Sequence, residues 1–109
     1  TTFGYSGLVI SGRNVSCQIQ NTGMVSGVEV PQLYLRFPAV AGEPPLQLKG
    51  FQSMVIAKGG SATVAFELND RSFSIWDAEA HAWAIISGAY GVLVGSSSED
   101  IRLTGTLTV

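Results

Sequence analysis

Apolar and polar residues alternate along most of this chain with a period of two, which is the spacing of a β-strand and not of a helix. In the last nine residues, apolar side chains stand at positions 101, 103, 107 and 109, and polar side chains stand at the even positions between them. The same alternation occurs in 15–20, 63–68 and 90–94. Glycine, asparagine and aspartate separate these segments, as they do at chain reversals. The pattern predicts seven to eight short antiparallel strands in an all-β sandwich or barrel.

The alternation changes phase at two places. Before Pro31 the apolar positions are even (28 and 30), and after it they are odd (33, 35 and 37). Because proline has no backbone N–H to donate to a ladder, we expect an edge position or a bulge there. A similar change occurs near Gly50, within 46–57. Such slips turn apolar side chains toward both faces of a strand, so the pattern predicts some exposed apolar surface.

Length and charge restrict the class of protein. The 109 residues fit one domain that spans 1–109. A net charge of −2 disfavours a nucleic-acid binder or a polybasic membrane module. The apolar stretch 80–95 contains His81 and is too short for a membrane-spanning helix. With one cysteine and one histidine, the sequence predicts no internal disulfide, no zinc site of the usual kind and no cofactor.

The low proportion of charged residues is the unusual feature of the composition. Charged residues make up 13% of the chain, whereas soluble domains average about 25%. Two interpretations account for this, and they are compatible. The protein is secreted and has a neutral, hydroxyl-rich surface, or part of its surface is buried against neighbouring domains of a longer chain.

Six segments, in this order, resemble one known family. They are 21–23 (NTG), 30–35 (VPQLYL), 44–51 (PPLQLKGF), 72–77 (SFSIWD), 88–95 (GAYGVLVG) and 100–105 (DIRLTG). Together they are similar to the fibronectin type III-like domain at the C-terminus of glycoside hydrolase family 3 enzymes. The stretch GEPP at 42–45 is similar to the secreted fungal β-glucosidase branch. The chain departs from the family at Lys58 and at Ile86-Ser87, where members commonly carry a proline.

This resemblance implies an immunoglobulin-like sandwich of two antiparallel sheets, of the fibronectin type III type. It also implies a non-catalytic domain that packs on the catalytic domains of a secreted enzyme. β-Glucosidases, which hydrolyse terminal β-D-glucosyl residues, are the expected parent. β-Xylosidases and β-N-acetylglucosaminidases share the family, so the substrate of the parent stays open.

The residues themselves predict no catalytic site within this chain. A glycosidase needs two carboxyl groups about 5 Å apart, or about 6.5–9.5 Å apart, across a cleft. Asp70, Asp77 and the Glu99-Asp100 pair all fall on turns, where such side chains accept local hydrogen bonds. We expect His81 on the surface and Cys17 in the core. The resemblance implies that the catalytic Asp and Glu belong to the larger preceding domains.

Four aromatic residues are candidates for a binding or domain-packing surface. These are Trp76, Trp83, Phe37 and Phe51. Packing in the core or on a neighbouring domain is the simpler interpretation. The alternative is an aromatic strip that binds a polysaccharide or lignin. The apolar loop 37–45 and Met54 could extend the same contact surface.

Two further residue sets have a defined expected role. Asn14-Val15-Ser16 is a sequon for N-glycosylation, and Asn14 falls at the start of a predicted strand. Phe66 and Tyr90 have the apolar parity of their strands, so we expect both in the core. The Tyr90 hydroxyl could also tie a corner of the chain to the backbone, as in immunoglobulin-like domains.

Overall fold

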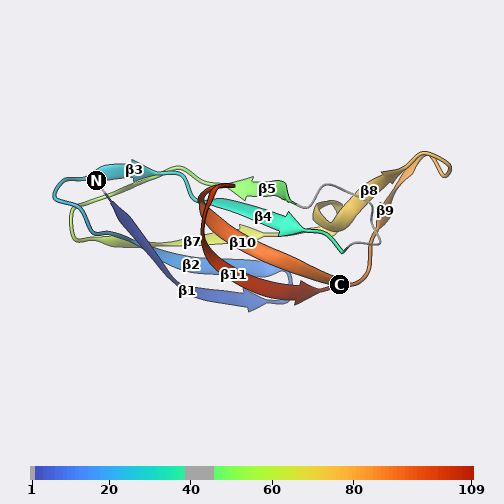
Figure 1. Ribbon diagram of the computed structural model, residues 1–109, viewed down its shortest axis with the longest axis horizontal. Coiled ribbons are helices and arrows are strands. Elements are labelled where there is room, and N and C mark those ends of the chain that lie inside the picture. The colour runs from blue at the N-terminus through green and yellow to red at the C-terminus, as the bar shows by residue number, and fades with distance from the viewer. Residues whose placement is uncertain (1, 39–45) are drawn as a thin grey trace.

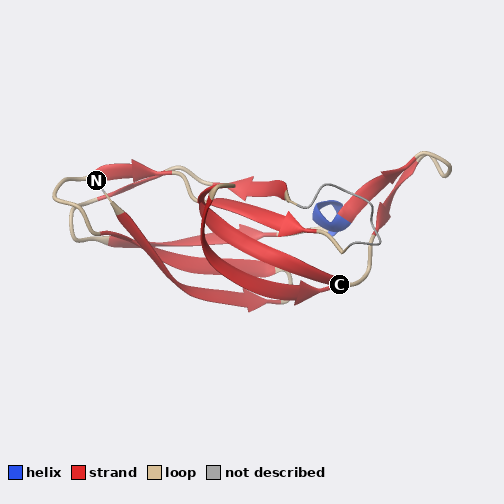
Figure 2. Ribbon diagram, in the orientation of Figure 1, coloured by secondary structure: helices blue, strands red, loops and turns tan. Residues whose placement is uncertain are grey.

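The computed structural model describes residues 2–38 and 46–109, and its regular elements are almost all β-strands (Figure 2). The molecule is elongated, with extents of 54 × 22 × 18 Å. The predicted all-β fold class is therefore confirmed. Within the described residues, no helix has the length and apolar character needed to cross a membrane.

Two larger sheets face each other and form the body of the molecule (Figure 1). The first has the order β1 (Phe3–Ser11), β2 (Asn14–Asn21) and β7 (Ser61–Glu67). The second has the order β11 (Asp100–Thr108), β10 (Ala89–Ser97), β4 (Gln32–Arg36) and β5 (Gln47–Phe51). Every neighbouring pair is antiparallel. The arrangement is the predicted sandwich of three strands on four.

Two short ribbons extend the sandwich at opposite ends of its long axis (Figure 1). One pairs β3 (Gly27–Glu29) with β6 (Met54–Ile56). The other pairs β8 (Ser74–Asp77) with β9 (Ala82–Ile85), and a helical turn, η2 (Asp70–Phe73), precedes it. The expected seven to eight strands therefore hold for the two large sheets alone. The ribbons raise the number in the described residues to eleven.

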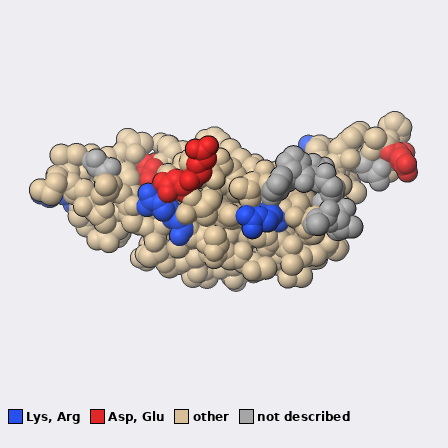
Figure 3. Space-filling view, in the orientation of Figure 1, with Lys and Arg blue, Asp and Glu red and all other residues tan. Residues whose placement is uncertain are grey.

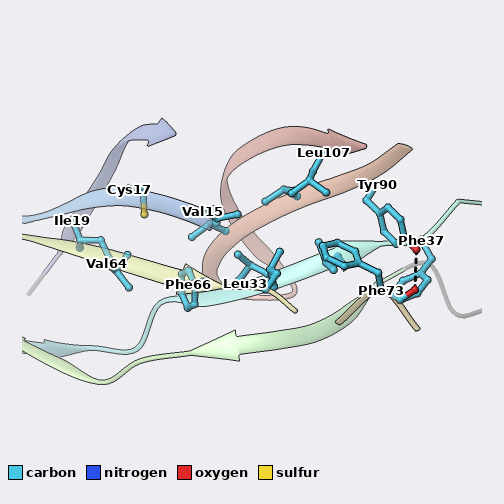
Figure 4. Close-up of a cluster of buried hydrophobic side chains, with 14 of the residues drawn as sticks. Val15, Cys17, Ile19, Leu33, Phe37, Val64, Phe66, Phe73, Tyr90 and Leu107 are labelled. Carbon is cyan, nitrogen blue, oxygen red and sulfur yellow. Dashed lines mark hydrogen bonds between the residues drawn. The ribbon is translucent and has the colours of Figure 1, made fainter. Parts of the chain in front are cut away.

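The core lies between the two large sheets, and the alternation predicts most of it (Figure 4). Cross-strand pairs such as Val15–Phe66 and Cys17–Val64 both point inward. Phe66 and Tyr90 are 6% and 0% exposed, as predicted. Leu93 departs from the pattern because it is 6% exposed although its parity is opposite to that of the core residues of β10. It lies on the outer face of an interior strand, where both neighbouring strands shield it.

The two phase changes have different structural causes. At Pro31 the chain leaves the β3–β6 ribbon and enters β4 of the larger sheet. The expected edge position or bulge is therefore a break between two strands, and Pro31 itself is buried. Near Gly50 the register between β4 and β5 shifts by one residue, which leaves Lys49 as the extra residue of a bulge.

Candidate functional site

The β8–β9 ribbon displays two tryptophans side by side. Trp76 and Trp83 are direct cross-strand partners, and the turn at 78–81 brings them together. Their rings meet edge to face, with centroids 5.7 Å apart and an interplanar angle of 71°. Cross-strand aromatic pairs of this kind stabilise a hairpin. The side chains nevertheless stay half exposed, at 51% and 47%.

Arg71 covers one face of this pair. Its guanidinium carbon lies 3.4 Å from the centre of the Trp83 ring, which is a close cation–π contact. Arg71 lies in η2, and a capping box fixes the start of that turn. The Asn69 side chain accepts a 3.2 Å hydrogen bond from the Ser72 N–H, and the Ser72 hydroxyl accepts one of 3.1 Å from the Asn69 N–H.

The ribbon is anchored at its base to the core. The buried Tyr90 hydroxyl donates to the backbone carbonyl oxygen of Phe73 (3.1 Å), as Figure 4 shows, and to that of Ile86 (2.5 Å). The Phe73 carbonyl also accepts a 3.0 Å hydrogen bond from the Ile86 N–H. Burial raises the pKa of Tyr90, so the hydroxyl keeps its proton and remains a donor. The expectation that Tyr90 ties a corner to the backbone is confirmed.

An open groove of about 540 Å³ lies between the ribbon, η2 and β5. Its lining combines the two tryptophans, two cations and two amides, namely Trp76, Trp83, Lys49, Arg71, Gln47 and Asn69. Lys49 reaches the groove because the bulge near Gly50 changes the direction of β5. The mixture of aromatic, cationic and amide groups suits a partner surface, or a ligand, with both apolar and polar parts.

The acidic residue of η2 has a partner outside the groove. Asp70 of η2 forms an ion pair with Arg13. The Asp77 side chain lies outside the part of the chain that the structure describes. Charged groups are sparse over the face seen in Figure 3, as the 13% charged content requires. In the described residues, the groove itself is therefore lined by cations and neutral groups.

The other predicted candidates are distributed as follows. Phe51 ends β5 and is 65% exposed, whereas Met54 is partly buried against the core. Phe37 is only 6% exposed, so its expected place on a contact surface is wrong. Its ring packs edge to face on Tyr90, with centroids 5.0 Å apart, and this contact draws it into the core. The remainder of the expected contact loop, 39–45, lies outside the described residues.

The titratable candidates lie apart from one another. Asp100 begins β11 and accepts hydrogen bonds from Arg102 and Ser96, which lower its pKa to about 2. His81 is exposed in the turn of the ribbon. Cys17 is 2% exposed, and burial raises the pKa of its thiol. Among the described residues, no group of three potential metal ligands occurs.

Comparison with known proteins places this fold in a family. The sequence of residues 29–98 matches the fibronectin type III-like domain. The chain belongs to this family. It is 50% identical over 96 residues to "Probable beta-glucosidase D" of Aspergillus niger, a match that covers 88% of this chain and 13% of that protein. The protein of the same name from Emericella nidulans is 43% identical, over 97% of this chain and 13% of its own length.

Solved structures of fibronectin type III-like relatives have the same fold. The β-D-glucoside glucohydrolase of Trichoderma reesei superposes with a TM-score of 0.91 at 36% identity, covering 100% of this chain and 19% of that one. The GH3 β-glucosidase of Bifidobacterium adolescentis gives a TM-score of 0.92 at 32% identity, covering 99% and 17%. This chain therefore spans only a small part of the enzymes that it resembles.

Of the groove residues, only the two tryptophans were expected from the sequence, and neither of its two cations was. The tryptophans could be paired from the hairpin turn between them, but Arg71 and Lys49 carry no comparable signal. Arg71 reaches Trp83 only because η2 folds back beside β9. Lys49 reaches the groove because of a bulge, whose side-chain direction does not follow the period of two.

Proposed function

We propose that this chain is a non-catalytic packing domain of a secreted family 3 β-glucosidase, and that the β8–β9 ribbon and its groove dock on the catalytic domains. The catalytic domains would hydrolyse terminal β-D-glucosyl residues, and this domain would hold their arrangement. The relatives support the proposal because they are β-glucosidases of which the matching region is about 13%.

One observation carries the docking role. The tryptophan pair is half exposed on a ribbon whose base is fixed by Tyr90, while the core between the sheets is complete without it. Tryptophan and arginine are the residues that most often dominate protein interfaces. A rigid element that presents Trp76, Trp83 and Arg71 together therefore suits a permanent neighbour.

The test uses the longer protein encoded by the gene that contains this sequence. We expect Trp76→Ser with Trp83→Ser to lower the midpoint of its thermal inactivation by several degrees and to leave KM for an aryl β-glucoside unchanged. The same double variant in the isolated chain measures how much of the loss belongs to the ribbon itself.

The matched control changes two exposed valines of the other ribbon, Val28→Ser with Val55→Ser. A midpoint equal to that of the wild-type protein in the tryptophan variant would overturn the docking role. A reading frame in which these 109 residues stand without catalytic domains would overturn the packing proposal as a whole.

Carbohydrate or lignin binding is the second candidate function. The groove combines tryptophan side chains with the amides of Gln47 and Asn69, and aromatic faces with amides suit sugar rings. A sedimentation assay with insoluble cellulose and with lignin separates the two functions. Retention of the wild-type chain that is lost with Trp76→Ala and Trp83→Ala would favour this binding role over docking.

A further inference from the structure

The chain contains three asparagines, and two of them have clear structural roles. The buried Asn21 side chain donates to the carbonyl oxygens of Val25 (2.8 Å) and Ile56 (2.9 Å), which joins the β2–β3 connection to β6. Asn69 caps η2. Asn14 makes no side-chain hydrogen bond to the described residues, although asparagine is disfavoured in strands. Among the described residues, no side-chain hydrogen bond holds Asn14 in place, in contrast to Asn21 and Asn69.

Asn14 is placed where a bulky modification can be accommodated. It is the first residue of β2, directly after the turn that contains Gly12 (φ 60°), and its side chain is exposed. Val15 points into the core and is 0% exposed. Because side chains alternate along a strand, Asn14 and Ser16 share the outer face of the sheet. The sequon is thus presented outward with its middle residue buried.

The surroundings of Asn14 on this face are mostly small or polar. On β7 its cross-strand partner is the exposed Glu67, and Ser16 pairs with the exposed Ala65. On β1 the corresponding partners are Ser11 and Val9, of which Val9 is 56% exposed. A sugar chain that leaves Asn14 therefore meets hydroxyl, carboxylate and small aliphatic groups, and no large aromatic side chain of β2 or β7 competes for the space.

We propose that Asn14 is an N-glycosylation site and that the outer face of the β1-β2-β7 sheet faces solvent in the assembled protein. The donor would be a polyprenyl-diphosphate-linked oligosaccharide in the lumen of the endoplasmic reticulum. The Asn14 side-chain nitrogen forms a bond to the anomeric carbon of the first sugar and loses one proton. The bond between that carbon and the phosphate oxygen breaks, and the polyprenyl diphosphate leaves with the electron pair.

The docking groove is bordered by β5 of the four-stranded sheet and by η2. Asn14 lies near the η2 side, because its neighbour Arg13 forms an ion pair with Asp70, but it belongs to the outer face of the three-stranded sheet. The proposal therefore requires a neighbour that approaches the groove from the β5 side, which leaves the glycan free. The proposed glycosylation depends only on Asn14 and its strand. It can therefore be tested independently of the proposed packing role.

The experiment passes the full chain through the secretory pathway of a filamentous fungus behind a cleavable signal. Peptide mapping of both secreted and retained material, before and after an amidase that releases N-glycans, reports the state of Asn14. We expect a glycan on the wild-type Asn14 peptide, and conversion of Asn14 to aspartate in heavy-oxygen water upon release. Folded wild-type protein whose Asn14 peptide is wholly unmodified would overturn the proposal.

Three variants separate the sequon from the fold. Asn14→Gln and Ser16→Ala should abolish the glycan completely, and Ser16→Thr should retain it because threonine also completes the sequon. Loss of the glycan in Ser16→Thr as well would contradict a sequon-dependent modification. In the longer protein, the glycan should be released by the amidase without denaturation. Resistance until the protein is unfolded would overturn the solvent-facing orientation of the sheet.

Discussion

The Tyr90 hydroxyl donates a 3.1 Å hydrogen bond to the backbone carbonyl of Phe73, and the rings of the two residues also meet edge to face, 5.1 Å apart. Both side chains are 0% exposed. One residue lies in an interior strand of the sandwich and the other ends η2, directly before the tryptophan ribbon. This contact therefore couples the exposed ribbon to the rigid core, and the orientation of Trp76 and Trp83 depends on it.

Tyr90→Phe should lower the free energy of unfolding by about 1–3 kcal/mol, because the Ile86 carbonyl loses the hydroxyl donor and the buried Phe73 carbonyl keeps only the Ile86 N–H. Urea denaturation followed by fluorescence measures the loss. Tyr34→Phe is the matched control, since the Tyr34 hydroxyl bonds the Gln32 side chain at a partly exposed position and should matter by less than about 0.5 kcal/mol. Equal losses of unfolding free energy in the two variants would show that the hydrogen bonds of the Tyr90 hydroxyl contribute no more to stability than that of Tyr34.

Gly50→Ala should destabilise the chain by about 1–3 kcal/mol through overpacking. A Cβ at position 50 would lie 2.9 Å from Cδ1 of the Phe66 ring, which is too close for real atoms. Gly4→Ala is the control, because its Cβ would meet only Thr22 at 3.7 Å and should be neutral or stabilising by up to about 1 kcal/mol.

The partner of Gly50 can be tested in a double-mutant cycle. Phe66→Leu narrows the side chain that the new Cβ meets, so the double variant should lose less free energy than the sum of the two single changes. Strictly additive losses would show that the cost of Gly50→Ala comes from somewhere other than the Phe66 ring.

The sequence predicts the sandwich well because one physical rule governs it. Wherever a strand has one face on the core, as at Val15, Cys17 and Ile19, burial follows the parity of the residue number. The rule fails for Leu93, which neighbouring strands shield. Phe37 obeys the rule, because it continues the buried parity of β4 and packs on Tyr90, and only its expected place on a contact surface was wrong. These outcomes depend on tertiary neighbours that no local pattern contains.

The groove was only half predictable for the same reason. A cross-strand pair such as Trp76–Trp83 follows from a hairpin, which is a local structure. The contact of Arg71 with Trp83 requires the path of η2, and the groove itself requires β5, which is far away in the sequence. Long-range packing therefore forms the groove, and the sequence pattern alone predicts only its two tryptophans.

Asp100→Asn should weaken the dependence of the unfolding free energy on pH at acid pH. The Arg102 and Ser96 hydrogen bonds hold the pKa of Asp100 at about 2, below its ordinary value of 3.8. Because the folded state binds this proton less readily, its contribution to stability is complete above pH 3.8 and is lost as the pH falls to about 2. The asparagine has no such titration, so the difference in unfolding free energy between the two proteins should shrink across that interval.

Urea denaturation at a series of pH values in low salt measures this difference, in which the carboxylates common to both proteins cancel. Added salt should reduce the effect, because Asp100 and Arg102 are near the surface. Parallel profiles for the wild-type chain and Asp100→Asn would contradict the lowered pKa.

The isolated chain should self-associate at high concentration through the tryptophan ribbon. Trp76 and Trp83 are cross-strand partners and are 51% and 47% exposed. Large apolar side chains exposed side by side on a small domain mark a contact surface that water solvates poorly. Sedimentation velocity over a range of concentrations should show a weight-average mass that rises for the wild-type chain and rises much less for Trp76→Ser with Trp83→Ser.

The valines of the other ribbon are the control, because Val28→Ser with Val55→Ser removes exposed apolar groups of smaller area and should leave the association nearly unchanged. A wild-type chain that stays monomeric, or equal effects of the two double variants, would show that the tryptophan ribbon is not a preferred contact surface.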